Sequence, residues 1–215
     1  MKLTEQLTAL GGIFGVVVLG FILFFWLAPA PGAVQVFTQD QMVRAGSAMT
    51  GTTTAKVTMV EWGDFECPAC GTLAPVLEQI IATYKNNPDF NFVFRNFPLP
   101  QHKNARLAAE AAEAAGAQGR YWDMYALLYK NQKEWTSSAN PRASFDAYAK
   151  DIKLDLPAFA AALDTHAYAA EITQDYQDAV TLRLSHTPTI FLNGIEQTDT
   201  TFSSLKKAID AALAK

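Results

Sequence analysis

The chain has 215 residues, of which 17 are Lys or Arg and 21 are Asp or Glu, and half of its residues are hydrophobic. This length accommodates one or two domains with a buried core, while the net charge of −4 argues against nucleic acid as the main partner, because phosphate binding needs clustered Lys and Arg. Two cysteines exclude a disulfide-rich scaffold and cannot by themselves fill a four-ligand zinc site.

The N-terminal segment predicts a single membrane anchor. Residues 10–28 form an almost unbroken apolar run of 19 residues after a short segment 1–9, and a helix of that length, at ~1.5 Å per residue, spans a hydrocarbon core of roughly 30 Å. A cleaved signal peptide is the alternative, since Ala28-Pro29-Ala30 looks like a cleavage site, but signal peptides usually hold only about 7–15 apolar residues. Lys2, before the span, favours an external position for the remaining chain.

The segment after the span reads as a tether. Residues 29–55 contain recurring Pro and Gly and a Thr-rich stretch at 50–54. Residues 34–37 could form a short strand, but the sequence identifies no partner for it. We expect the globular part to begin at Lys56.

A strand–helix–strand unit opens the globular part. Residues 57–60 are β-branched and apolar enough for a buried strand. A helix is predicted to start near Cys67-Pro68, because Pro is favoured at the first helical position, and Pro75 inside it should bend it. After a turn signal at residues 86–89, residues 90–95 form a second strand. These lengths predict a right-handed parallel crossover.

A long helical block follows. Its periodicity predicts five helices, at residues 103–117, 119–129, 141–152, 157–163 and 167–184. Arg106, Glu110 and Glu113 have the spacing of a solvated side on the first of them. The aromatic and Met positions of the second are attributed to the core rather than to a cofactor site.

The pattern returns to strands after Pro188. Residues 189–192 and a short strand near Ile195 flank Asn193-Gly194, which is the strongest short signal for a β-hairpin. Ser203 is predicted to cap a final amphipathic helix.

The chemistry is expected at Cys67-Pro68-Ala69-Cys70. At a helix start, unpaired backbone N–H groups and the positive helix end favour a thiolate on the first cysteine, and a stabilised thiolate makes the disulfide form oxidising. The second cysteine lies one turn further in, where it can resolve a mixed disulfide. Half of a zinc site and a purely structural disulfide are the alternatives, but none of the three histidines, His102, His166 and His186, has the pair spacing of a metal site.

Two segments resemble the DsbA-like branch of the thioredoxin superfamily: VEWGDFECPAC at residues 60–70 and TPTIFLNG at 187–194. The resemblance covers residues 56–215, and residues 118–122 are similar to the family's inserted-helix signature. It implies a thiol–disulfide oxidoreductase of α/β class. The expected architecture is a thioredoxin-like domain at residues 56–98 and 185–215, with an inserted helical domain at 99–184.

The resemblance also implies the role of each site residue. Cys67 matches the attacking cysteine, Cys70 its resolving partner, and Pro75 the helix-kinking proline. Pro188 matches the cis-proline, whose loop faces the disulfide and pairs with the substrate backbone, and Thr187 would contact the sulfurs or the substrate. From the residues alone, Thr187-Pro188 is only a strand start where proline is tolerated.

Glu61 matches the family's buried acid beneath the disulfide. A carboxyl group in a central strand is costly to bury, so we expect a raised pKa and a role in proton transfer; the alternative is a strand-end glutamate that reaches water. Asp64 and Glu66 are expected to be exposed loop acids that raise the pKa of Cys67. His102 could serve the surface or the site, and His186 could sense the thiolate.

The chain departs from the family pattern between the two cysteines. It carries Pro68-Ala69, whereas the best-known oxidising members carry Pro-His. Ala69 supplies no cation, so the disulfide should be less oxidising than theirs. Membrane-anchored relatives with similar motifs nevertheless often act as oxidases, and we expect the same here.

The sequence therefore predicts a membrane-anchored oxidase on the extracytoplasmic side, or a secreted one if the N-terminus is cleaved. Its substrates would be exported cysteine-containing proteins, and relatives suggest a quinone-linked membrane partner that reoxidises it. No organic cofactor or metal is expected, since the two sulfurs carry the electrons. A reductase or isomerase, a non-catalytic binding module and a zinc-binding domain remain the alternatives.

Overall fold

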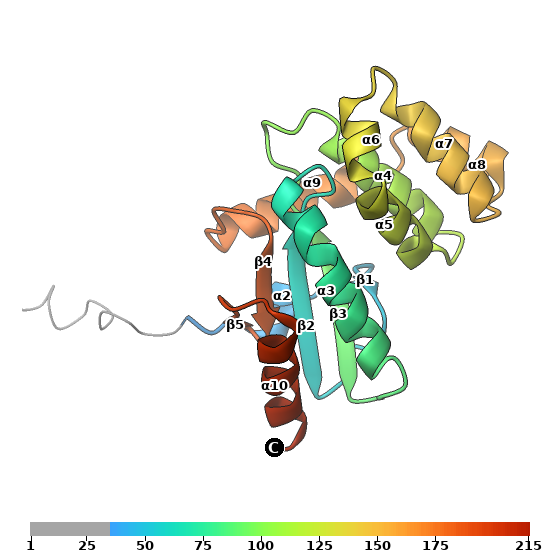
Figure 1. Ribbon diagram of the computed structural model, residues 1–215. Helices are drawn as coiled ribbons and strands as arrows, with labels where there is room; N and C mark the ends of the chain where they lie inside the picture. Colours follow the sequence, from blue (N-terminus) through green and yellow to red (C-terminus); the bar gives the residue numbers. More distant parts are fainter. Residues whose placement is uncertain (1–34) are drawn as a thin grey trace, which may run out of the picture. The chain divides into compact units, whose positions relative to one another are not determined.

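The computed structural model of the chain describes residues 35–215 (Figure 1). The predicted anchor at residues 10–28 and the segment 1–9 lie outside these residues. Within the described part, none of the helices combines the length and apolar character that a membrane crossing requires. The elements are α2 (Gln39–Met42), β1 (Ala48–Met49), β2 (Val57–Gly63), α3 (Pro68–Tyr84), β3 (Phe90–Asn96), α4 (Ala105–Gly116), α5 (Tyr121–Lys130), α6 (Gln132–Ser137), α7 (Pro141–Asp151), α8 (Leu156–Asp164), α9 (Ala169–Thr181), β4 (Thr189–Leu192), β5 (Ile195–Glu196) and α10 (Phe202–Leu213).

The strands form one mixed sheet in the order β1-β3-β2-β4-β5. β2 and β3 are parallel, as the predicted crossover requires, and the other neighbouring pairs are antiparallel. The β4–β5 hairpin is confirmed. Its turn residues Asn193 and Gly194 have φ values of 47° and 77°, the left-handed conformation that a two-residue hairpin turn needs.

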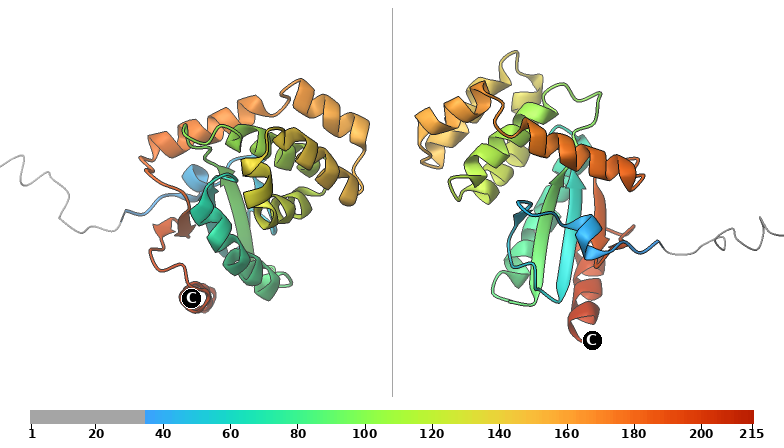
Figure 2. Two further views of the ribbon diagram at one scale, coloured as in Figure 1. Left: turned by 45° about the horizontal axis from the view of Figure 1, so that its top comes forward. Right: turned by 180° about the vertical axis from the view of Figure 1, so that it is seen from behind.

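The two faces of the sheet are covered by different helices (Figure 2). Side chains alternate along each strand, so Val57 and Met59 of β2 face α3 and α10, while Val60 and Trp62 face α2 and α9. On that second face the buried Arg95 of β3 forms a 2.8 Å ion pair with Asp175 of α9. By the same alternation Glu61 shares the face that α3 covers.

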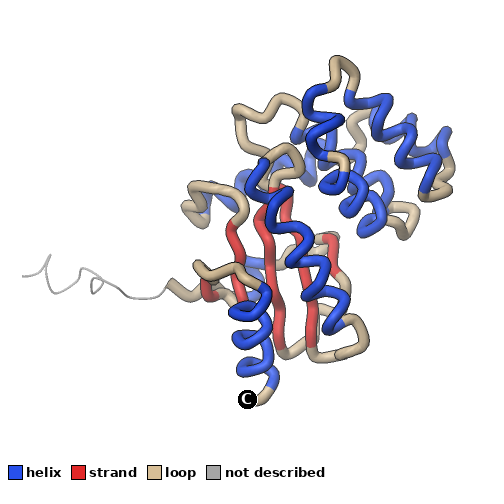
Figure 3. Tube along the Cα trace, in the orientation of Figure 1, coloured by secondary structure: helices blue, strands red, loops and turns tan. Residues whose placement is uncertain are grey.

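A group of helices, α4 to α8, gathers at the end of the sheet where β2 stops and α3 starts (Figures 1 and 3). It has its own core, which also includes Phe65 and both cysteines. The described part of the chain holds six helices between β3 and β4, so the expectation of five is wrong. The additional helix, α6, has only six residues, too few to show a helical period.

The segment before Lys56 is not a tether over residues 36–55. It contains α2 and β1, β1 pairs with β3, and Phe37 and Met42 are buried against the sheet. Val36 also forms an isolated antiparallel bridge with Ile195. The few large apolar residues of segment 36–55 pack on the sheet despite the surrounding Gly and Thr. The predicted boundary between tether and globular domain at residue 55 is therefore wrong for this segment.

Two local predictions about helices are also corrected. The N-cap of the last helix is Thr201 rather than Ser203, and its side chain makes no capping hydrogen bond to the helix. The Thr201 N–H and hydroxyl instead donate to the carboxylate of Asp199. On α4, Arg106 is exposed, but Glu110 is buried against His166 and Glu113 is half-buried. Neighbouring helices cover α4 on several sides, so the carboxylates find partners instead of water.

Candidate redox site

The first cysteine lies at the junction between the sheet and α3. Cys67 is the N-cap of α3 and Pro68 its first residue, as predicted. The Cys67 N–H donates to the carbonyl of Asp64 at 3.0 Å, and its own carbonyl accepts the Gly71 N–H at 3.1 Å. Pro68 and Ala69 are exposed, whereas Cys67 is 7% exposed and Cys70 is fully buried. The more accessible sulfur is therefore the one at the helix start.

Both cysteines are free thiols in this structure, and their acidities diverge. The pKa of Cys67 is lowered from 9.0 to about 5, chiefly by the hydrogen bond from the Cys70 thiol and further by Thr187 and by the backbone N–H groups of Cys70 and Ala69. The predicted helix-end effect is thus present but is not the largest cause. The pKa of Cys70 is instead raised well above its usual value by burial, by the hydrogen bond between the Cys70 and Cys67 side chains, and by the charge of Glu61.

The proline loop meets the first cysteine from 120 residues away in the chain. The Thr187-Pro188 bond is cis, as the resemblance implied, and the Cys67 thiol donates to the carbonyl of Thr187 at 3.4 Å. The buried Thr187 hydroxyl has no hydrogen-bond partner among the residues that the structure describes. It is therefore free to donate to the sulfur when Cys67 is a thiolate.

Glu61 is fully buried, and its charge acts on both cysteines. Burial raises its pKa from 4.5 to about 8, a hydrogen bond from Tyr125 opposes the rise, and the charge of Cys67 adds to it. Oε2 accepts the Tyr125 hydroxyl at 3.0 Å, and Oε1 has no partner among the described residues. A carboxyl group that titrates near neutral pH can carry a proton to and from a neighbouring thiol.

The acids of the loop before Cys67 differ from the prediction. Asp64 is only 2% exposed, and its carboxylate accepts hydrogen bonds from the Glu66 and Leu99 N–H groups and from Nδ1 of His102. Glu66 is half-buried and accepts the Asn104 N–H at 2.6 Å. These acids anchor the loop to the segment after β3. His102 has a structural role in this anchor.

The other histidines lie apart from one another. His166 contacts Glu110 at 3.0 Å, and the exposed His186 contacts the Pro188 carbonyl at 3.2 Å. Over residues 35–215, no group of three or more His, Cys, Asp or Glu side chains is arranged to hold a metal ion.

The redox site also contains two residues of the helical block that were not assigned to it from the sequence. Tyr125 of α5 contacts Glu61, and Gln132 of α6 contacts the backbone of the loop that leads into Cys67. Both lie more than 60 positions away in the chain from the groups they touch, so no local pattern could reveal them.

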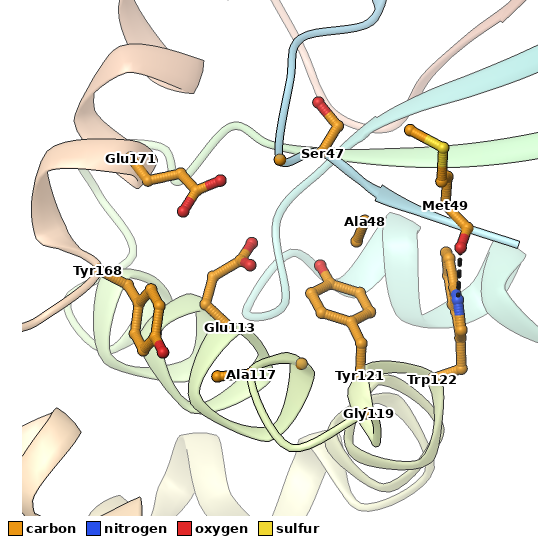
Figure 4. A pocket seen from close by; sticks show the side chains of 12 residues that line it. Ser47, Ala48, Met49, Glu113, Ala117, Gly119, Tyr121, Trp122, Tyr168 and Glu171 are labelled. Carbon is orange, nitrogen blue, oxygen red and sulfur yellow. Dashed lines mark hydrogen bonds between the residues drawn. The ribbon is translucent and has the colours of Figure 1, made fainter. Parts of the chain in front are cut away.

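A separate cavity of about 480 Å³ lies between α4, α5, α9 and the segment around β1 (Figure 4). Glu113 and Glu171 project into it beside Tyr121, and burial together with the charge of Glu171 raises the pKa of Glu113 to about 8. Neither cysteine lines this cavity, so it is distinct from the redox site.

Comparisons with known proteins agree with this geometry. The thioredoxin family model matches residues 44–211. The probable disulfide bond formation protein D of Bacillus cereus is 32% identical over 166 residues, which cover 75% of this chain and 76% of that protein. The chain belongs to the DsbA-like thiol–disulfide oxidoreductases of the thioredoxin family. BdbD from Bacillus subtilis shares the fold of this DsbA-like enzyme, with a TM-score of 0.73 at 24% identity over 85% of this chain and 100% of that one.

Further relatives are much longer proteins. The Na⁺/H⁺ antiporter NhaA 1 of Salinispora arenicola is 40% identical over 141 residues, or 65% of this DsbA-like chain. The match spans only 20% of that antiporter. The chain thus covers about a fifth to a quarter of the length of the antiporters that it matches.

Proposed function

We propose that this DsbA-like enzyme is an oxidase that introduces disulfides into exported proteins through Cys67 and Cys70. The observation that carries the proposal is the opposite displacement of the two thiol pKa values, to about 5 for Cys67 and well above 9.0 for Cys70. A stabilised Cys67 thiolate favours the reduced enzyme and therefore makes the enzyme's disulfide a stronger oxidant.

The exchange proceeds in two steps that balance in electrons. A substrate thiolate attacks Sγ of Cys67 in the enzyme disulfide, forming a mixed disulfide and releasing Cys70, which takes up a proton. A second substrate thiolate then attacks the substrate sulfur of the mixed disulfide, and Cys67 leaves as a thiolate. The substrate loses two electrons and gains a disulfide, and the enzyme becomes a dithiol.

The residues around the sulfurs support each step. Glu61, with a pKa of about 8, holds a proton near neutral pH that the released Cys70 can accept. The Thr187 hydroxyl can donate to the departing Cys67 thiolate. The exposed Pro68-Ala69 pair leaves the Cys67 side of the disulfide open to a protein substrate.

The cellular setting is part of the proposal. An extracytoplasmic location, reached through an anchor at residues 10–28, is where protein disulfides persist. Reoxidation requires an acceptor of two electrons, for which a quinone-linked membrane partner is the candidate. The name of the Bacillus cereus relative refers to disulfide bond formation, which favours the oxidising direction here over reduction or isomerisation.

A redox titration of the purified full chain against glutathione, with alkylation trapping of free thiols, tests the proposal. An oxidase is expected to have a potential nearer to about −120 mV than to the about −270 mV of thioredoxin. A thioredoxin-like value would instead support the reductase, and a Cys67→Ser variant with undiminished biological function would support the non-catalytic binding module.

A further inference from the structure

A side chain of the helical block binds the backbone that carries the attacking cysteine. Gln132 is the first residue of α6 and is 8% exposed. Its Nε2 donates to the carbonyls of Phe65 and Cys67, each at 2.8 Å. Both acceptors are carbonyl oxygens, so only the nitrogen end of the carboxamide can face them.

The helix that starts at the cysteines leaves space for this carboxamide. A Cβ added at Gly71 of α3 would collide with Oε1 of Gln132 and lie 2.8 Å from its Cδ. Glycine is unfavourable inside a helix, and here it makes room for the side chain of Gln132. The Gly71 N–H also donates to the Cys67 carbonyl at 3.1 Å, so this carbonyl accepts two hydrogen bonds.

We propose that Gln132 is a positioning residue for thiol–disulfide exchange. By binding the carbonyls of Phe65 and Cys67, on either side of Glu66, it fixes the Cys67 backbone so that the sulfur stays at the start of α3. Its N–H groups also offset the partial negative charge of the carbonyl oxygen of Cys67, the residue that carries the thiolate. The inference rests on the proposed role of Cys67 as the attacking cysteine, and it assigns part of that reactivity to the inserted helices.

The structural context explains why an amide is used at this position. The loop is already packed by Phe65 against Tyr125 and Tyr129 of α5, with ring centroids 5.8 and 5.0 Å apart. Aromatic packing locates the loop but leaves buried carbonyls that require donors. Gln132 supplies the donor for both carbonyls from one side chain.

The first test replaces Gln132 by Met, which has a similar length but no donor. The pKa of Cys67, measured in the reduced full chain from the pH dependence of alkylation with each cysteine resolved by mass spectrometry, should rise by about one unit, a roughly tenfold loss of thiolate at a pH below both values. Gln118→Met is the matched control, because the Gln118 carboxamide also binds backbone, at the N–H and carbonyl of Asp155. The control should leave the pKa of Cys67 unchanged.

We call the two hydrogen bonds from Gln132 to the Phe65 and Cys67 carbonyls the clamp. A lower melting temperature of Gln132→Met without a change in the pKa of Cys67 would overturn the inference, because the clamp would then be only structural. The role of Gln132 is decided by the difference in the pKa of Cys67 between Gln132→Met and the wild type, whatever the wild-type pKa is. The wild-type pKa of Cys67 tests the proposed function instead. If Cys67 titrates as an ordinary thiol in the wild type, the proposed function fails, and a pKa rise in Gln132→Met would still support the clamp.

A second test uses the steric dependence of Gln132 on Gly71. Gly71→Ala should displace the carboxamide and raise the pKa of Cys67 in the same direction as Gln132→Ala. In the double variant the added methyl group meets no glutamine, so it should cause no further rise beyond that of Gln132→Ala alone. Additive shifts from the two substitutions would contradict the clamp.

Discussion

The hydroxyl of Tyr125, on α5, donates a 3.0 Å hydrogen bond to Oε2 of Glu61, on the central strand β2. This bond joins the inserted helices to the floor of the redox site, and it works against the burial that raises the pKa of Glu61. The same contact, together with burial, raises the pKa of Tyr125, so the phenol remains a proton donor to the carboxyl group.

Removal of this hydroxyl should raise the pKa of Glu61 further. In Tyr125→Phe the carboxylate loses the hydrogen bond that stabilises its charged form, so its midpoint should move above about 8. Infrared difference spectra of the carboxyl stretch against pH, with Glu61→Gln to identify the band, measure the shift. Tyr176→Phe, on α9, is the control. An unchanged or lower midpoint in Tyr125→Phe would contradict this role of the hydroxyl.

The burial of Glu61 should make stability depend on pH. In the unfolded chain the carboxyl releases its proton near its ordinary pKa of 4.5, whereas the folded chain holds it until about pH 8. Between these values the folded state binds more protons, so its stability falls as pH rises. Glu61→Gln removes this loss, and the gap between variant and wild type should change by on the order of 4 kcal/mol across that range.

Denaturant unfolding of the reduced proteins at several pH values checks this prediction. Glu113, whose pKa is also raised to about 8, is present in both proteins and cancels in the difference. If the free energies of unfolding of Glu61→Gln and of the wild type differed by the same amount from pH 4.5 to 8, Glu61 would have to reach water.

Loss of the Thr187 hydroxyl should weaken the thiolate. Thr187→Val keeps the shape of the side chain and removes one of the donors that lower the pKa of Cys67. The midpoint for Cys67 should rise from about 5 towards the ordinary thiol value, as measured by thiolate absorbance. Thr189→Val is the matched control, because the Thr189 hydroxyl donates to the His186 carbonyl at 2.7 Å instead. Equal shifts in both variants would argue against a specific donor.

The residue between the cysteines should tune the potential. Ala69 is exposed and contributes only its backbone N–H to the thiolate. In Ala69→His a protonated imidazole would stabilise the Cys67 thiolate, so the disulfide should become more oxidising by about 30 mV for each ~1.4 kcal/mol of stabilisation. Equilibration with glutathione measures the change, and Ala69→Gln supplies a polar control without charge. A potential that is unchanged or lower in Ala69→His would contradict this electrostatic account.

Local signals were sufficient to predict much of the sheet and the start of α3. The apolar run at residues 57–60, the Cys67-Pro68 helix start and the Asn193-Gly194 turn each depend on neighbouring residues, and each is found in the structure. The burial of Glu61 is confirmed, but it was implied by the resemblance to the DsbA-like branch, since the residues alone left a strand-end glutamate that reaches water as an alternative.

Contacts between distant segments were not predictable in this way. Asp64 has the sequence context of a loop acid, and its burial depends on donors from Leu99 and His102. Gln132 lies in a helix too short for a period to show, and its partners are backbone carbonyls, which leave no trace in side-chain patterns. Within residues 36–55, Ala48 and Met49 form β1 by pairing with the edge of β3, a partner that lies more than 40 positions away in the chain.

The divergence of the two thiols is tested most directly by following alkylation of each cysteine in the reduced full chain as a function of pH. We expect Cys67 to react with a midpoint near 5 and Cys70 to stay unreactive up to and beyond pH 9. A shared midpoint at the ordinary thiol value, or a Cys70 that reacts before Cys67, would contradict the assignment of attacking and resolving cysteines.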